Sequence, residues 1–250
     1  MPESLAFRVE IAQQLRTNGS IEVRAVSPAD LRDPELLESL VPIRQVKALR
    51  KKRARVRYQP FRNQERPPVA CEGRPEALRV MELDRKGEVE WIVGQPMWLH
   101  VQMRGRLVFR HAPDFLYAFK DGGIMLENVR PPSRRTPEFL EKAEMCERFV
   151  RLQGWRYQTV GGHDGYGEEI LWYLWNYALV EPLPDVVRRV VAAFRKRPIW
   201  RLGELRQKCA PNLADYPTLM ALVWRGELAV DYHEPLSIWT QVRLGQRRLQ

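Results

Sequence analysis

Short apolar runs rich in branched and aromatic residues fill the middle of the chain, and turn residues separate them, a pattern typical of β-strands. Turns are expected at 104–106 and 120–123. Segments with helical spacing lie before, among and after the strands, at 75–81, 136–153 and 168–180. The predicted strands cover residues 91–93, 97–103, 107–111, 115–119, 124–130 and 155–160. This order predicts an α/β fold in which helices flank a mixed sheet.

The two ends of the chain have patterns of their own. The first sixty residues contain two mixed segments, 6–11 and 21–25, and a predicted helix start at Ser27, which proline follows. Beyond Pro182 and Pro184, three helical segments at 185–196, 202–209 and 217–224 precede a predicted hairpin of residues 225–232 and 237–243. Three helices followed by a hairpin are typical of a winged helix. We therefore divide the chain into an N-terminal extension (1–60), a central domain (61–181) and a winged-helix domain (184–250).

The charge balance indicates the class of partner. Lys and Arg number 41 against 31 Asp and Glu, which gives a formal net charge of +10. Such a surplus favours nucleic acid, because clustered cations neutralise phosphates. The densest run, from residue 47 to residue 57, contains seven cations and no acid, and we expect it to contact double-stranded DNA, although such runs are often only solvated. The seven cations are Lys47, Arg50, Lys51, Lys52, Arg53, Arg55 and Arg57.

Cysteine usage and hydropathy indicate the compartment. The three cysteines lie far apart and form no CxxC pair, which argues against a disulfide framework and a structural zinc site. No N-terminal stretch combines basic residues with an apolar run, as a secretory signal would. The longest apolar run, 170–180, is roughly half of the length that crosses a bilayer. We therefore expect a cytoplasmic protein that makes no contact with membranes.

Four polar residues are candidates for a metal-dependent site. Asp114 begins a predicted strand, and Glu76 lies at the start of a predicted helix. Asn128 and Arg130 are two apart on another strand, so their side chains project to the same face. Carboxylate and carbonyl oxygens of Glu76, Asp114 and Asn128 are ligands that suit Mg²⁺ or Mn²⁺, which activates water and holds a phosphate. Arg130 would then neutralise charge on the phosphate oxygens.

Each candidate also has a simpler structural interpretation. Asp114 can serve only to begin a strand, and Glu76 can be an acid favoured by the helix dipole, with Glu72 competing for its role. Asn128 and Arg130 can be no more than a strand end before two prolines. His111 and His163 lack partners at ligand spacing and are interpreted as structural. The aromatic residues at 172–177 are interpreted as packing, since a base-stacking platform needs exposed rings on a sheet.

Four short segments together resemble the TnsA-like endonuclease subunit of heteromeric transposases. They are Cys-Glu-Gly-Arg-Pro-Glu at 71–76, Gly-Gln-Pro-Met-Trp-Leu at 94–99, Arg-His-Ala-Pro-Asp-Phe at 110–115 and Asn-Val-Arg-Pro at 128–131. The resemblance covers about residues 60–180 and continues at 222–231 and 235–240, which look like the winged-helix domain of longer family members. It implies a restriction-endonuclease-like PD-(D/E)xK nuclease domain at 61–181.

By this resemblance, Glu76 corresponds to the helix carboxylate and Asp114 to the central metal ligand. Asn128 occupies the position of the second acid of the PD-(D/E)xK motif, where the family also accepts an amide. Arg130 occupies the position of the motif's lysine. A guanidinium stabilises anionic oxygens but cannot accept a proton from water, so Arg130 is the larger departure.

The function implied is cleavage of the 5′ strand at transposon ends with Mg²⁺ or Mn²⁺. A DDE-type transposase subunit would cut and join the other strand, and an ATP-dependent transposition regulator would couple the two. Two alternatives remain open at this point. One is a catalytically silent DNA-binding architectural subunit that recruits partners. The other is a repair or restriction nuclease that acts without a partner.

Overall fold

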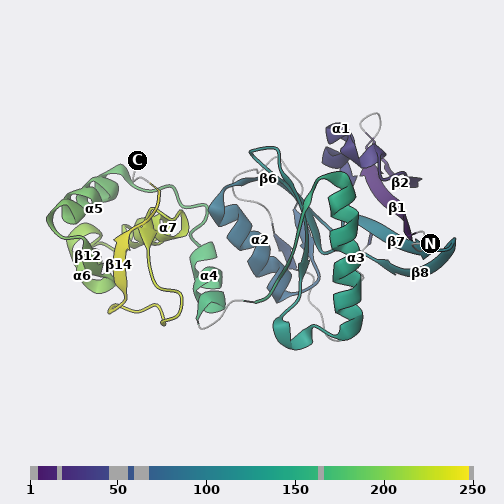
Figure 1. Cartoon of the computed structure of the whole chain (residues 1–250). Coiled ribbons are helices and arrows are strands. Elements are labelled where there is room, and N and C mark those ends of the chain that lie inside the picture. Colours follow the sequence, from purple (N-terminus) through teal and green to yellow (C-terminus); the bar gives the residue numbers. More distant parts are fainter. Residues whose placement is uncertain (1–4, 16–18, 45–55, 59–67, 163–165, 248–250) are drawn as a thin grey trace. The chain divides into compact units, whose positions relative to one another are not determined.

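The computed structural model describes residues 5–15, 19–44, 56–58, 68–162 and 166–247 (Figure 1). Within these ranges the protein is of the mixed α/β class, with helices and several β-sheets. The chain divides into two compact units. The first comprises Met1–Val80 and Glu88–Gly162, and the second comprises Met81–Gly87 and His163–Gln250. In the described ranges, no helix has both the length and the apolar character needed to cross a bilayer.

A four-stranded sheet organises the first unit. Its order is β11 (Arg156–Val160), β10 (Ile124–Val129), β9 (Phe115–Phe119) and β6 (Val89–Gly94). Strand β9 runs antiparallel to both neighbours, whereas β10 and β11 are parallel. A parallel pair needs a crossover connection, and helix α3 (Pro137–Gln153) provides it after a short 3-10 turn, η2 (Pro132–Arg134). The strands predicted at 115–119, 124–130 and 155–160 are confirmed to within one residue.

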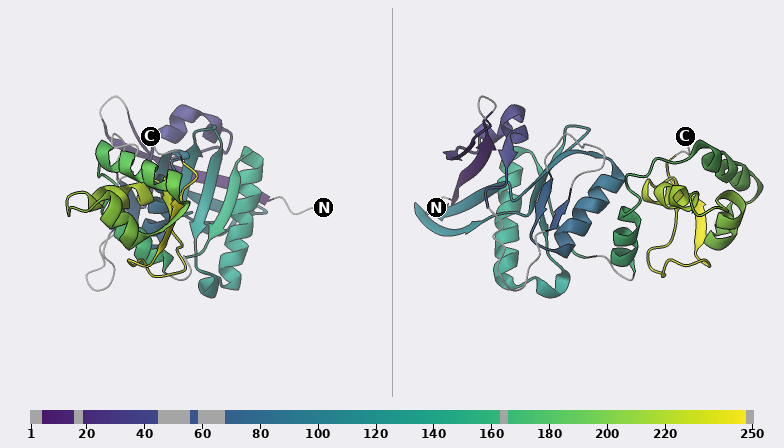
Figure 2. Two further views of the ribbon diagram at one scale, coloured as in Figure 1. Left: turned by 90° about the vertical axis from the view of Figure 1, so that its left-hand side faces the viewer. Right: turned by 180° about the vertical axis from the view of Figure 1, so that it is seen from behind.

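Helices α2 (Arg74–Lys86) and α3 cover opposite faces of this sheet (Figures 1 and 2). Two neighbouring residues of β10 therefore face different helices. Glu127 accepts a hydrogen bond from Arg79 of α2, and the Asn128 side chain contacts Cys146 of α3. The limits of α3 follow its sequence, because the Thr136 hydroxyl accepts from the Phe139 N–H and Gly154 ends the helix with φ 72°. Helix α2 extends beyond the predicted 75–81, because buried apolar positions continue to Leu83.

A second sheet joins the N-terminal residues to the middle of the chain. Its order is β2 (Ile21–Val26), β1 (Leu5–Gln14), β7 (Met97–Met103) and β8 (Arg106–His111), with β3 (Leu40–Val41) also on β1. The predicted turn between β7 and β8 is confirmed. Arg104 and Gly105 both have positive φ, 51° and 76°, as a two-residue hairpin turn requires. A further pair is formed by β4 (Val56–Tyr58) and β5 (Val69–Cys71).

The helix predicted to start at Ser27 begins later. Ser27 and Asp30 bond to each other's backbone N–H, and only a 3-10 turn follows, η1 (Asp30–Arg32). Asp33 then caps the short helix α1 (Pro34–Glu38), where its side chain accepts from the Glu35 N–H. The local side-chain bonds of Ser27 and Asp30 therefore favour a turn over the start of a long helix.

One hydrophobic core connects the two main sheets of the first unit. It contains residues of both sheets and of α3, among them Val9, Ile11, Leu99, Leu116, Leu126 and Phe149. None of these six side chains is measurably exposed. The strands of the first forty-odd residues therefore belong to the same compact body as the four-stranded sheet.

In its described residues, 166–247, the second unit contains four helices and a small sheet, besides the last residues of α2. The helices are α4 (Gly167–Trp175), α5 (Pro184–Lys196), α6 (Leu202–Cys209) and α7 (Tyr216–Trp224). The sheet has the order β12 (Ile199–Arg201), β14 (Gln241–Leu244), β13 (Leu228–Ala229). The three helices predicted after Pro184 are confirmed. The predicted hairpin strands are shorter than expected, and β12 adds a third strand that the sequence pattern did not indicate.

Candidate functional site

Asp114 lies where three strands of the four-stranded sheet meet. Its backbone N–H donates to the Glu127 carbonyl (3.1 Å), and its carbonyl accepts from the Gln95 N–H (2.7 Å). Its carboxylate oxygen Oδ2 accepts from the Val129 N–H at 2.7 Å. These bonds hold the residue between the end of β6, the start of β9 and the end of β10. Asp114 therefore has a fixed position at one end of the sheet.

Glu76 approaches Asp114 from the first turn of α2. Its Oε2 accepts from the backbone N–H of Glu72 at 2.5 Å, and Glu72 forms an ion pair with Arg44. Burial raises the pKa of Glu76 to about 8, and the charge of Asp114 adds to this effect. Two carboxyl groups in one desolvated place repel each other when both are ionised.

The pKa of Asp114 is raised for the same reason. Burial and, to a smaller extent, the carboxylates of Glu72 and Glu127 raise it to about 6, against the opposing effects of the Val129 hydrogen bond and of Arg130. Asp114 thus responds electrostatically to Glu72 just before α2, to Glu127 of β10 and to Arg130 just beyond the end of β10. The structure brings Glu76, Asp114 and Arg130 to the same end of the sheet.

Asn128 is buried on the α3 side of β10, with 1% of its surface exposed. Its Oδ1 lies 3.0 Å from His111 Nε2, and its Nδ2 donates to the Tyr157 hydroxyl at 2.7 Å. The Tyr157 hydroxyl lies 2.9 Å from the Thr159 hydroxyl. Both polar groups of the amide are therefore bonded within the protein.

His111 belongs to the same network, although its sequence context indicated only a structural role. Burial lowers its pKa, and the positive charges of Lys142, Arg130 and Arg44 lower it further, whereas the hydrogen bond to Asn128 opposes this. The Arg130 side chain is exposed, and its guanidinium lies 5.4 Å from the centre of the Phe139 ring. Cations thus surround the end of the sheet at which the acids meet.

A second polar network lies on the opposite face of β10, where sequence reasoning assigned no role. Glu127 is completely buried and accepts from Arg79 of α2, with Nε–Oε1 at 2.9 Å and Nη2–Oε2 at 2.8 Å. The Tyr117 hydroxyl donates to it at 2.9 Å, and Gln158 also donates to it. Arg79 is one helical turn after Glu76, so this ion pair fixes the helix that carries Glu76. In the sequence, the only indication of this ion pair was an acid within a predicted strand, Glu127, and a cation three residues after Glu76, Arg79.

Within the described ranges, no three His, Cys, Asp or Glu side chains gather as a ready-made metal site. Of the residues predicted to hold a metal ion, Glu76 and Asp114 are the two whose carboxyl groups interact electrostatically. The cationic run from Lys47 to Arg55 lies outside the described residues. For Arg57 only the backbone is described, and it pairs with Ala70 between β4 and β5.

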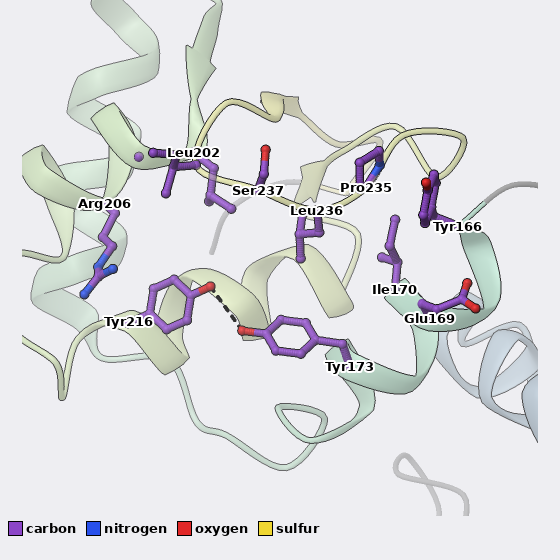
Figure 3. A pocket seen from close by; sticks show the side chains of 12 residues that line it. Tyr166, Glu169, Ile170, Tyr173, Leu202, Arg206, Tyr216, Pro235, Leu236 and Ser237 are labelled. Carbon is purple, nitrogen blue, oxygen red and sulfur yellow. Dashed lines mark hydrogen bonds between the residues drawn. The ribbon is translucent and has the colours of Figure 1, made fainter.

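The second unit contains a separate cleft of about 480 Å³ (Figure 3). Tyr173 of α4 and Tyr216 of α7 lie in it with their hydroxyls 3.1 Å apart, and the Arg206 guanidinium lies 5.1 Å from the centre of the Tyr216 ring. None of the residues singled out for chemistry in the sequence lines this cleft. It is therefore distinct from the group around Asp114.

In comparisons with known proteins, no family model matches this sequence, and no curated protein matches it significantly. The function of this protein therefore has to be inferred from its residues and their geometry.

Proposed function

We propose that this protein is a metal-dependent DNA endonuclease subunit of a heteromeric cut-and-paste transposase, similar to TnsA-like subunits. It would cleave the 5′ strand at transposon ends. The observation that carries the proposal is the position of Asp114, bonded to the N–H of Val129 between Asn128 and Arg130 and electrostatically coupled to Glu76. Phosphodiester hydrolysis needs acids that hold a metal ion and a cation that neutralises charge on the phosphate oxygens, and this end of the sheet has both kinds of group.

The order of elements supports the nuclease fold that the sequence resemblance implies. Helix α2, strands β6, β9 and β10, helix α3 and strand β11 follow in sequence, and β7 and β8 are inserted before β9. The candidate residues lie at the start of α2, just before β9 and at the end of β10. In the second unit, three helices and the strand order β12-β14-β13 support a winged helix.

The residues fit a divalent cation held by two carboxylates. Glu76 and Asp114 are desolvated, and the charge of Asp114 raises the pKa of Glu76, so a positive ion would relieve their repulsion. Mg²⁺ is commonly held by one or two carboxylates, with water and substrate phosphates as the remaining ligands. Asn128 would join them only by exchanging its bond to His111. Once bound, the ion would supply water activation and charge neutralisation.

The chain's own residues have separate tasks in this proposal. The Val129 N–H orients the Asp114 carboxylate, and the Glu72 N–H orients Glu76. Arg130 remains protonated and neutralises negative charge on the phosphate oxygens, but it cannot remove a proton from water. Arg79 and Glu127 hold α2 against the sheet and so keep Glu76 in place.

The test is nicking of transposon-end DNA with Mg²⁺ or Mn²⁺, in the presence of the partner transposase and the ATP-dependent regulator. Asp114→Ala should abolish cleavage of the 5′ strand. Glu144→Ala is the matched control, because it removes an exposed acid of α3. Unchanged cleavage by Asp114→Ala would refute the assignment. Equal cleavage without any transposase would assign the protein to the nucleases that act alone.

One observation favours a second candidate, a catalytically silent architectural subunit that binds DNA and recruits partners. Both polar groups of Asn128 are bonded within the protein, so the third expected ligand is already engaged. Calorimetry with Mn²⁺ discriminates the two functions. Binding that Asp114→Ala abolishes supports the nuclease, whereas no Mn²⁺ binding with intact DNA affinity supports the silent subunit.

A further inference from the structure

Helix α7 of the second unit presents almost no surface to a ligand. Residues Thr218–Trp224 are each at most 1% exposed. Helix α4 and the residues after it cover part of α7. The hydroxyls of Tyr173 and Tyr216 are hydrogen-bonded (Figure 3). The rings of Tyr177 and Tyr216 also meet edge-on, with their centres 6.4 Å apart. A buried helix cannot enter a DNA groove. Any contact of this unit with nucleic acid must use another surface.

The outer face of the small sheet offers such a surface. In the β12–β14 pair, Ile199 lies opposite Arg243 and Arg201 lies opposite Gln241. These four are exposed, whereas Val242 between them is completely buried, so the four side chains share the outer face. Trp239, just before β14, is 65% exposed, and the Arg201 guanidinium lies 5.2 Å from the centre of its ring. We call these five residues the β12–β14 face.

The two arginines of this face differ from several other arginines of the same unit in their partners. In the part of the chain that the structure describes, neither Arg201 nor Arg243 forms an ion pair with an acid, and the Arg243 side chain donates a hydrogen bond to the neutral Gln241. Glu204, which responds to the charge of Arg201, is already paired with Arg197. Three other arginines of the unit do have acidic partners, namely Arg188 with Asp185, Arg189 with Asp215 and Arg225 with Glu181. Asp231 and Glu234 line the same hollow as Trp239 and Arg243, but neither forms an ion pair with the two arginines, so both guanidinium groups are available to an external anion.

We propose that the β12–β14 face binds single-stranded DNA, with phosphates at Arg201 and Arg243 and a base stacked on Trp239. Diagonal neighbours on paired strands are about 7–8 Å apart, a spacing that lets both arginines reach successive phosphates of one strand. An exposed ring beside cations on a sheet is the arrangement that stacks unpaired bases, whose faces a duplex hides. The inference does not depend on the nuclease proposal, because Asp114 and its partners belong to the first unit.

The experiment measures binding of fluorescein-labelled dT20 to the full chain by anisotropy over a series of salt concentrations. The double variant Arg201→Ala/Arg243→Ala should reduce the slope of log affinity against log salt by about 1.4, since each single-strand phosphate contact contributes about 0.7. Trp239→Ala should weaken binding by about tenfold, and Trp239→Phe, which keeps an aromatic face, should restore most of it. The matched control is Arg148→Ala/Arg188→Ala, which removes two exposed, ion-paired arginines.

Several outcomes would overturn the proposal. An unchanged affinity and slope in the double variant would exclude this face. An equal loss of affinity in the control variant would mean that the effect comes from the lower net charge of the protein and not from this face. Tighter binding of a 20-base-pair duplex through the same residues would assign the face to double-stranded DNA, and equal competition by polyglutamate would assign it to an acidic protein. Asp114→Ala should bind dT20 like the wild type, so a failure here is distinguishable from failure of the nuclease proposal.

Discussion

The carboxylate of Asp114 accepts a hydrogen bond from the backbone N–H of Val129 at 2.7 Å, and this bond joins the residue before β9 to the end of β10. The side chain is thus oriented before any ligand arrives. An oriented acid loses little freedom on binding a cation, which favours binding at this position.

Two substitutions separate the structural role of Asp114 from its charge. Asp114→Asn keeps an oxygen that can accept from Val129, whereas Asp114→Ala does not. We expect both variants to lose Mn²⁺ binding, and Asp114→Asn to be more stable by about 1 kcal/mol. Urea unfolding and calorimetry measure the two effects. Mn²⁺ binding retained by Asp114→Asn would contradict the role of the charge, and equal stability would contradict that of the hydrogen bond.

The acid pair predicts a specific dependence of stability on pH. In the folded protein, the pKa of Glu76 is about 8 and that of Asp114 about 6, both above their ordinary values. The folded state therefore binds protons more tightly than the unfolded state, and the free energy of unfolding should fall as pH rises from about 4 to about 8. Glu76→Gln should remove much of this fall, roughly 4 kcal/mol between pH 5 and pH 8.5.

Denaturant titrations at pH 5 and pH 8.5 provide the measurement, with Glu144→Gln, an exposed acid of α3, as control. An identical pH dependence of wild type and Glu76→Gln would show that Glu76 is ordinarily ionised. Divalent-metal affinity should change in the opposite direction and rise over this pH range, because the ion must displace the bound protons.

The buried ion pair of Arg79 and Glu127 makes a prediction about stability. Arg79→Met leaves a buried carboxylate without its cation and should cost about 3–5 kcal/mol. The double variant Arg79→Met/Glu127→Gln removes both charges and keeps an oxygen that can accept from Tyr117, so it should recover most of the loss. Chemical denaturation measures both. A double variant that is no more stable than the single one would mean that the charge of Glu127 is not the cause.

The cationic run offers a test on double-stranded DNA. Replacing Arg50, Lys51, Lys52 and Arg53 by alanine should flatten the slope of log affinity against log salt by about three. Arg148→Ala/Arg151→Ala serves as control, because both arginines are exposed on α3 and paired with acids. A slope that does not change would assign the run to solvent.

Local sequence signals predicted much of the fold. The capping Thr136 and the terminal Gly154 marked α3, and the Lys120–Gly123 turn marked the β9–β10 hairpin. Long-range pairing could not be predicted in the same way. No local pattern indicates that β1 pairs with β7, or that the residues after Pro198 form a third strand beside β14, because both depend on partners far along the chain.

The same contrast between local patterns and long-range contacts applies to the candidate site. The alternation of side chains on β10 correctly separated Asn128 from Glu127. The sequence could not show that His111 and Tyr157 bond to the Asn128 amide, since these contacts join three different strands. It also could not distinguish the ion-paired cations of the second unit from Arg201 and Arg243. Metal binding and cleavage remain predictions.

The central place of β1 in its sheet has a practical consequence for anyone who shortens this protein. A fragment that starts at residue 61 would leave β7 with one bare edge and would uncover Leu99 where Val9 now pairs with it. Unpaired strand edges beside exposed apolar side chains promote aggregation. Such a fragment should come out of expression largely insoluble, and its failure to cut DNA would say nothing about chemistry.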